Sequence, residues 1–343
     1  MRTAPGSRQS RTYTYALHGV GLRLEGDDPS LLLRVRAILE HFGLGTAVPN
    51  PDPVPLRLVV SARQAPPLPD DAREIARQDG IRALGSDTGL WLDSGAHHFR
   101  LDLRGGVAQG WLPGATDPPR KDLVVYALLL LVRRRGLFAL HASAVVYRGA
   151  GYLFVAGSGS GKSTITYTLV RGGWDYLADD ALLLRPLGEG VEGLALRRDL
   201  CLDPVLATRF PEVAVHGAPG PFAGRGKHRL DMRTLFPHRL VACCRPQVLL
   251  FPEIAPLAKS RLVPLAPAEM LPRLIAQSAV LALDPETLPC HLAVLGRLAA
   301  QARGYRLLAG RDVEDAPERV VELLEPLVSV GSPAPSPSRL MGA

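Results

Sequence analysis

Lysine is nearly absent from this sequence. Only Lys121, Lys162, Lys227 and Lys259 occur among the 343 residues, so almost all of the 40 basic residues are arginines spread along the chain. The net charge of +7 is therefore not gathered into a basic stripe interleaved with aromatic residues, which is the pattern typical of single-strand binding. We expect no nucleic-acid partner.

Long apolar runs are absent as well. The longest, Leu123 to Val132, is too short to span a bilayer, which takes about 20 apolar residues. Residues 1–11 contain arginine and serine but not the apolar centre of a secretory signal. Because 47% of the residues are hydrophobic and 21% are charged, the chain can bury the cores of two domains. We expect a soluble, cytoplasmic protein with no membrane partner.

Cysteine is scarce and is not arranged for metal binding. The four cysteines, Cys201, Cys243, Cys244 and Cys290, show neither Cys-x-x-Cys spacing nor a histidine partner at a zinc-like interval. The pair His97-His98 also has no partner with zinc spacing, so it is interpreted as two strand histidines. These patterns predict reduced thiols and no zinc site.

What the sequence does contain is one chemically specific stretch, residues 152–180. A short apolar run at 152–155 predicts a buried strand, alternating glycines follow, and Lys-Ser-Thr opens a segment with helical character. This order is typical of a phosphate-binding loop, in which backbone N–H groups and a helix N-terminus face a polyphosphate. The first glycine of the usual pattern is replaced by Ala156. The residues expected to bind ATP are Gly157, Ser158, Gly159, Ser160, Gly161, Lys162, Ser163 and Thr164.

Two adjacent carboxylates complete this pattern. The run from Trp174 to Ala178 predicts a second strand, which ends at Asp179 and Asp180. A kinase needs both a magnesium ligand and a base beside its phosphate loop, and neighbouring strand side chains point in different directions. Lys162 is expected to reach the β- and γ-phosphates. We assign Mg²⁺ binding to Ser163 with Asp179.

Three segments resemble the catalytic domain of HPr kinase/phosphorylase and its relatives. They are Leu140 to Val145, Ser158 to Ser163 and Leu177 to Asp180. The resemblance implies that Asp180 is the catalytic base, with His141 nearby on the preceding strand and Lys162 on the phosphates. No match to that family's Arg-Gly-Leu-Gly-type segment follows Asp180, so the reverse, phosphorolytic reaction is not predicted. The resemblance leaves a homo-oligomer open.

The alternation of strand and helix around the loop predicts an α/β fold, with a P-loop kinase domain of the HPr-kinase type preceded by a small α/β domain. The expected divisions are a mobile tail (1–11), an N-terminal domain (12–116), the catalytic domain (117–330) and a disordered tail (331–343).

Several individual elements are also predicted from the sequence. The first is a helix that starts at residues 28–30, with Asp28 or Ser30 as its cap, and has an apolar face at 31–42. The others are helices at 121–135, 267–283 and 288–304, a strand at 137–147 and a glycine-rich lid at 216–229. The cluster Arg133-Arg134-Arg135 is interpreted first as a helix end and second as a contact for an acidic substrate.

Three functions remain open at this point. The first is an ATP-dependent kinase that phosphorylates a hydroxyl, expected to be a serine, of a protein or peptide. The second is a small-molecule kinase that uses the same residues. The third is a nucleotide-dependent binding protein or switch that transfers no phosphate. Fold alone does not separate them, since one fold hosts many activities.

Overall fold

The computed structural model describes residues 11–45, 55–114, 121–196, 199–219, 226–278 and 280–327. The chain divides into two compact units, residues 1–137 with 280–288, and residues 138–279 with 289–343. The predicted boundary near residue 116 differs from this division, because helix α2 (Lys121–Arg133) packs against strands β7 (His98–Asp102) and β8 (Val107–Trp111) of the first unit. The two predicted tails lie almost wholly outside the described residues.

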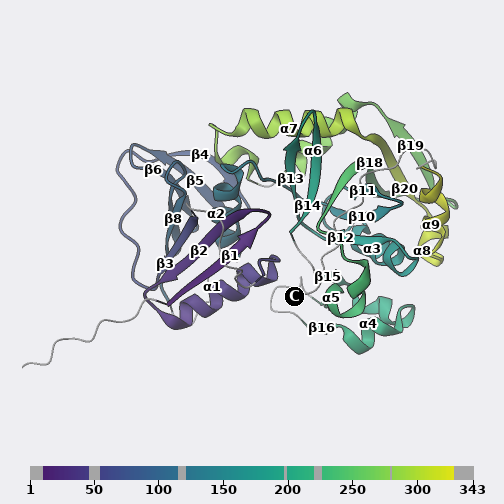
Figure 1. Ribbon diagram of the computed structural model, residues 1–343, viewed down its shortest axis with the longest axis horizontal. Helices are drawn as coiled ribbons and strands as arrows, with labels where there is room; N and C mark the ends of the chain where they lie inside the picture. Colours follow the sequence, from purple (N-terminus) through teal and green to yellow (C-terminus); the bar gives the residue numbers. More distant parts are fainter. Residues whose placement is uncertain are drawn as a thin grey trace, which may run out of the picture. The chain divides into compact units, whose positions relative to one another are not determined.

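The first unit is an α/β unit built on one mixed sheet (Figure 1). Its strand order is β1-β2-β3-β8-β7-β6-β5-β4, in which β2, β3 and β8 run parallel and the remaining pairs are antiparallel. The other strands are β1 (Arg11–Leu17), β2 (Val20–Gly26), β3 (Leu56–Ser61), β4 (Arg73–Gln78), β5 (Ile81–Ser86) and β6 (Gly89–Asp93).

Two helices of the first unit pack against its sheet. Helix α1 (Pro29–His41) contacts β2, and it also contacts α2. Asp28, one of the two cap residues that the sequence offered, caps α1 by accepting a hydrogen bond from the Leu31 amide at 2.7 Å. Leu31, Val35 and Ile38 are fully buried and provide the face of α1 that meets the sheet.

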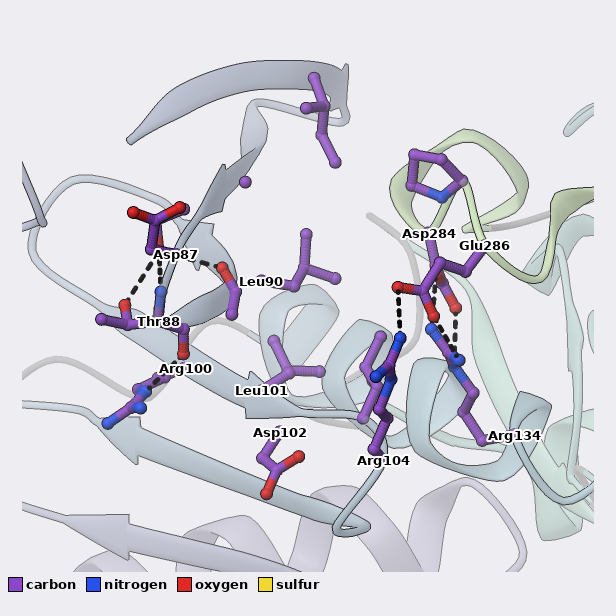
Figure 2. A pocket seen from close by; sticks show the side chains of 16 residues that line it. Asp87, Thr88, Leu90, Arg100, Leu101, Asp102, Arg104, Arg134, Asp284 and Glu286 are labelled. Carbon is purple, nitrogen blue, oxygen red and sulfur yellow. Dashed lines mark hydrogen bonds and ion pairs between the residues drawn. The ribbon is translucent and has the colours of Figure 1, made fainter. Parts of the chain in front are cut away.

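The segment 280–288, which includes a short 3-10 helix η3 (Leu281–Leu283), belongs to the first unit through an arginine pair at the end of α2. Arg133 donates to the Val280 carbonyl at 2.7 Å, and Arg134 binds both oxygens of Asp284 at 3.0 and 3.1 Å. Arg134 also contacts Glu286, and these side chains lie together beside a cavity of about 590 Å³ in Figure 2. The structural interpretation of the arginine cluster therefore accounts for Arg133 and Arg134.

The second unit has a larger sheet with the order β12-β10-β11-β18-β14-β13-β9, and β20 joins it between β18 and β19. Its strands are β9 (Phe138–Leu140), β10 (Ser143–Tyr147), β11 (Ala150–Phe154), β12 (Asp175–Ala178), β13 (Leu182–Leu187), β14 (Gly190–Ala195), β18 (Cys243–Ile254), β19 (Arg261–Leu265) and β20 (Arg303–Ala309). A small separate sheet contains β15 (Asp199–Leu202), β17 (His228–Asp231) and β16 (Ala218–Pro219).

Helix α3 (Lys162–Arg171) lies in the core of the second unit. Ile165, Leu169 and Val170 on α3 share one buried cluster with Phe154 and Trp174. The other helices are η1 (Pro204–Thr208), α4 (Pro211–His216), α5 (Met232–Leu235), η2 (Pro237–Arg239), α6 (Pro267–Ala276), α7 (Leu288–Gln301), α8 (Arg311–Asp315), α9 (Arg319–Leu324) and η4 (Glu325–Leu327). This core fixes the helix that follows the glycine-rich loop.

Two sequence predictions need correction in this unit. The expected strand 137–147 is two strands, β9 and β10, which pair with different partners and are separated at His141 and Ala142. The expected helix 267–283 ends at Ala276, because the Gln277 carbonyl instead accepts a hydrogen bond from the His141 amide at 2.7 Å. Both corrections concern the backbone around His141.

Candidate functional site

A strand, a glycine-rich loop and a helix follow one another at residues 150–171. β11 is fully buried, residues 155–161 form the loop, and α3 begins at Lys162. Gly159 and Gly161 have φ of +83° and +84°, the left-handed region that glycine tolerates best. Ala156 is not among the residues with positive φ, so the glycine usual at this position is not needed for the backbone here.

The Lys162 side chain folds back over this loop. Its Nζ donates to the carbonyls of Ala156 at 2.6 Å and Gly157 at 2.8 Å, and the residue is only 6% exposed. Burial lowers the pKa of the Lys162 amine, and the nearby positive charge of Lys227 lowers this pKa further, while Asp179 and Asp180 oppose the shift. An anionic ligand beside this buried amine would therefore stabilise its charged form.

The two aspartates lie opposite the segment 141–143 in an interrupted antiparallel ribbon. Leu140 pairs with Leu182 on one side of the interruption, and Ala144 pairs with Ala178 on the other, in the same register. Residues 141–143 therefore lie opposite residues 179–181 although no regular ladder joins them. The interruption brings side chains from two separate strand pairs to one place.

Asp179 is buried, and two hydroxyl groups donate to it. The Ser163 Oγ lies 3.1 Å from Asp179 Oδ1 and 3.0 Å from Oδ2, and the Ser143 Oγ donates to Oδ1. Asp179 is 1% exposed and Ser143 is 0% exposed. A buried carboxylate is costly unless donors compensate for lost water, and these hydroxyls supply that compensation.

Asp180 has the opposite environment. Its side chain is 48% exposed, and its φ is +68°, which is uncommon for a residue with a side chain. The Ala181 amide donates to the Asp179 carbonyl at 2.8 Å, so Asp180 is the central residue of a three-residue turn. Such strained turns are most frequent at functional sites.

His141 contacts Asp180 in two ways. Its Nδ1 lies 2.7 Å from the Asp180 carbonyl oxygen and 3.4 Å from the carboxylate Oδ1. A carbonyl only accepts, so the shorter contact requires the proton on Nδ1 and, in a neutral ring, leaves the lone pair on Nε2. His141 thus holds the turn that presents Asp180.

The structure brings Lys162, Ser163, Asp179, Asp180 and His141 together. Among the loop residues, the buried Ser160 Oγ has no hydrogen-bond partner within the described parts of the chain. Ser143 was not predicted as a site residue. Its signals were one hydroxyl side chain in an apolar run and its place in the Leu140 to Val145 segment that carries the resemblance.

The predicted lid at 216–229 is only partly described, since residues 220–225 lie outside the described residues. At the end of the lid segment, Arg229 donates a hydrogen bond from its Nε to Asp199 Oδ2 at 2.6 Å. Lys227 is the lid residue whose charge acts on Lys162. Of the two, Lys227 is the side chain with an electrostatic link to the candidate site.

The donors present fit a nucleotide with magnesium. Gly157, Gly159 and Gly161 leave open space where a Cβ would point, so a ligand can approach the loop backbone closely. Ser163 and Asp179 offer the hard oxygen atoms that Mg²⁺ prefers, and Mg²⁺ usually takes one or two protein oxygens with phosphates and water. Within the described residues no group of three or more His, Cys, Asp or Glu side chains forms a metal site.

Comparisons with known proteins add little to this description. No family model and no curated protein matches the chain. The solved structure of the Hpr(Ser) kinase/phosphatase from Coxiella burnetii is similar at 16% identity, covering 55% of this chain and 95% of that chain, with a TM-score of 0.31. At this TM-score the similarity carries no argument about fold or activity. Among the described residues, none of the helices has the length and apolar character needed to cross a membrane.

Proposed function

We propose that this protein is an ATP-dependent kinase that transfers the γ-phosphate to a serine hydroxyl of a protein or peptide. The observation that carries the proposal is the contrast between two adjacent aspartates. Asp179 is buried and hydrogen-bonded to Ser163, whereas the Asp180 carboxylate is half exposed beside His141. One carboxylate suits a metal site and the other suits an incoming substrate.

The nucleotide phosphates would be held by the loop and the start of α3. The N-terminus of a helix of this length favours anions, and the loop amides add further donors. Lys162 would exchange its bonds to the Ala156 and Gly157 carbonyls for phosphate oxygens. Phosphate binding then favours the charged amine, which burial disfavours in the free protein.

Ser163 and Asp179 would hold Mg²⁺, which supplies charge stabilisation at the β- and γ-phosphate oxygens. The Ser163 hydroxyl donates its proton to Asp179 and keeps its lone pairs for the metal. In P-loop enzymes a serine or threonine of the loop and an aspartate likewise hold the metal.

Asp180 would act as the base. Its carboxylate accepts the proton of the serine hydroxyl as the serine oxygen forms a bond to the γ-phosphorus and the bond to the ADP oxygen breaks. His141 fixes the Asp180 backbone through Nδ1, so the exposed carboxylate keeps one direction. Position and electrostatics, rather than covalent chemistry by the protein, carry such reactions.

The protein or peptide acceptor is supported by the resemblance of three sequence segments to HPr kinase/phosphorylase. The glycine-rich lid predicted at 216–229 would cover an extended chain and exclude water from the transferring phosphate. A small-molecule kinase and a nucleotide-dependent switch are the competing functions, and one assay separates all three.

The assay incubates the protein with γ-labelled ATP, Mg²⁺ and the products of neighbouring genes, and locates the label by mass spectrometry. We expect label on a serine of a protein or peptide, and no label when Asp180→Asn is used. Label found only on a small molecule would favour the second function. Tight nucleotide binding with no transferred label would favour the switch.

A further inference from the structure

Ser143 carries a fully buried hydroxyl that takes no part in the proposed reaction. It is the first residue of β10, and its neighbours Ala142 and Ala144 are also 0% exposed. In the interrupted ribbon it lies directly opposite Asp179, and its Oγ donates to Asp179 Oδ1. A lone hydroxyl is unfavourable in such surroundings unless it is hydrogen-bonded, and the carboxylate provides that bond.

The hydrogen bond from Ser143 to Asp179 gives Ser143 a specific role. A serine hydroxyl has one proton, so Ser163 can donate to only one of the two Asp179 oxygens at a time, although both lie within 3.1 Å. Because Ser143 donates to Oδ1, it fixes the rotation of the Asp179 carboxylate and thereby the position of both oxygens that face Ser163. The orientation of the Ser163 hydroxyl follows from the position of that carboxylate.

We propose that Ser143 is a positioning residue for the magnesium site, acting through Asp179. The inference rests on the proposed function, and it adds a residue that touches neither metal nor nucleotide. Groups that orient a metal ligand typically change metal affinity by about 10- to 100-fold when removed. Loss of the Ser143 hydroxyl frees the Asp179 carboxylate to rotate, so Asp179 and Ser163 no longer present one fixed arrangement to the metal.

The test measures binding and requires no catalysis. The affinity of the full chain for a non-hydrolysable ATP analogue is measured by calorimetry with and without Mg²⁺, and the ratio of the two constants gives the magnesium coupling. In Ser143→Ala we expect this coupling to fall by about tenfold, with the magnesium-free affinity within about twofold of wild type. Raising Mg²⁺ to saturation should restore the analogue affinity.

Thr166→Val is the matched control. Thr166 is also 0% exposed and lies on α3, but its Oγ1 has no hydrogen-bond partner within the described residues. Removing that hydroxyl should leave the magnesium coupling unchanged. Ser143→Cys keeps the side-chain size and donates only weakly, so it should show the same defect if Ser143→Ala does not fold.

The outcomes separate this inference from the proposed function. Wild-type coupling in both Ser143 variants would overturn the positioning role and leave the kinase proposal standing. A wild-type protein that binds the analogue without any magnesium coupling would overturn both. A defect that persists at saturating Mg²⁺ would also overturn the positioning role, because it would indicate general damage to the site.

Discussion

The two units bury charged side chains in different ways. In the first unit, buried Asp93 receives a hydrogen bond from Arg82 at 2.7 Å and lies 3.2 Å from His98, and buried Asp284 is bound by Arg134. At the candidate site of the second unit, Lys162 is held by backbone carbonyls, and hydroxyl groups donate to Asp179. An ion pair neutralises a buried charge within the fold. A buried charge whose hydrogen-bond partners are uncharged can still attract a ligand of opposite charge.

The difference belongs to the site rather than to the second unit as a whole. Asp199, in the same unit, is 2% exposed and is bound by Arg229 at 2.6 Å, which is the pattern of the first unit. A buried charged group suggests function only when no structural ion pair accounts for it. Asp93, Asp199 and Asp284 are explained by arginine partners.

The largest expected effect separates the two neighbouring aspartates. Asp180→Asn keeps the shape of the side chain but cannot accept a proton, so phosphoryl transfer should fall by about 10²- to 10⁴-fold with Mg-ATP affinity unchanged. Asp179→Asn should instead weaken magnesium-dependent nucleotide binding. Single-turnover transfer and equilibrium binding of both variants check this. Normal transfer by Asp180→Asn with loss in Asp179→Asn would mean that the two roles are reversed.

A second pair of variants tests whether Lys162 serves ligand binding whereas Arg134 stabilises the first unit. Lys162→Met should lower Mg-ATP affinity by about 10- to 100-fold, because a hydrogen bond to a charged group typically contributes about 1.5–3 kcal/mol. It should not lower the melting temperature of the ligand-free protein, because burial already disfavours the charged amine there, as the lowered pKa indicates.

Arg134→Met is the counterpart of Lys162→Met. It leaves the Asp284 carboxylate buried without its guanidinium and should destabilise the first unit by about 3 kcal/mol, with nucleotide affinity unchanged. Thermal unfolding and nucleotide titration of both variants give the comparison. Equal stability losses in the two variants would show that Lys162 is also a structural charge.

The smallest effect concerns a partly exposed ion pair between Arg57 and Glu25. The Arg57 guanidinium donates to Glu25 across β2 and β3 and holds the pKa of that carboxyl below its usual value. Because its pKa is lowered, ionised Glu25 stabilises the fold at pH values above the usual pKa of a glutamate. This stabilisation is lost as the pH falls through the lowered pKa. Glu25→Gln should therefore cost about 0.5 kcal/mol at pH 7 and nothing in strong acid. A cost independent of pH in urea unfolding would contradict this.

The strand-loop-helix and its acidic partners were predictable because their signal is local. Glycine spacing, Lys162-Ser163 and the apolar strand before Asp179 all lie within a short stretch, and the described geometry has the expected order. The deviation at Ala156 also has a physical reason, because its backbone does not require positive φ.

Other features depend on contacts that no local pattern records. β4 was missed because most of its residues are exposed and charged or polar, so its sequence lacks an apolar alternation. The assignment of 280–288 to the first unit depends on Arg134 meeting Asp284, 150 residues later in the chain. The role of Ser143 was missed for the same reason, since its partner Asp179 lies 36 residues later in the chain.

The return of residues 280–288 to the first unit sets an order of events during synthesis. When Arg134 leaves the ribosome, its partner Asp284 has not yet been made, and at about 5–20 residues per second the gap of 150 residues takes roughly 8–30 s. Through that interval the first unit lacks one of its segments while most of the second unit is being translated. The N-terminal part of this chain, although made first, is therefore completed late.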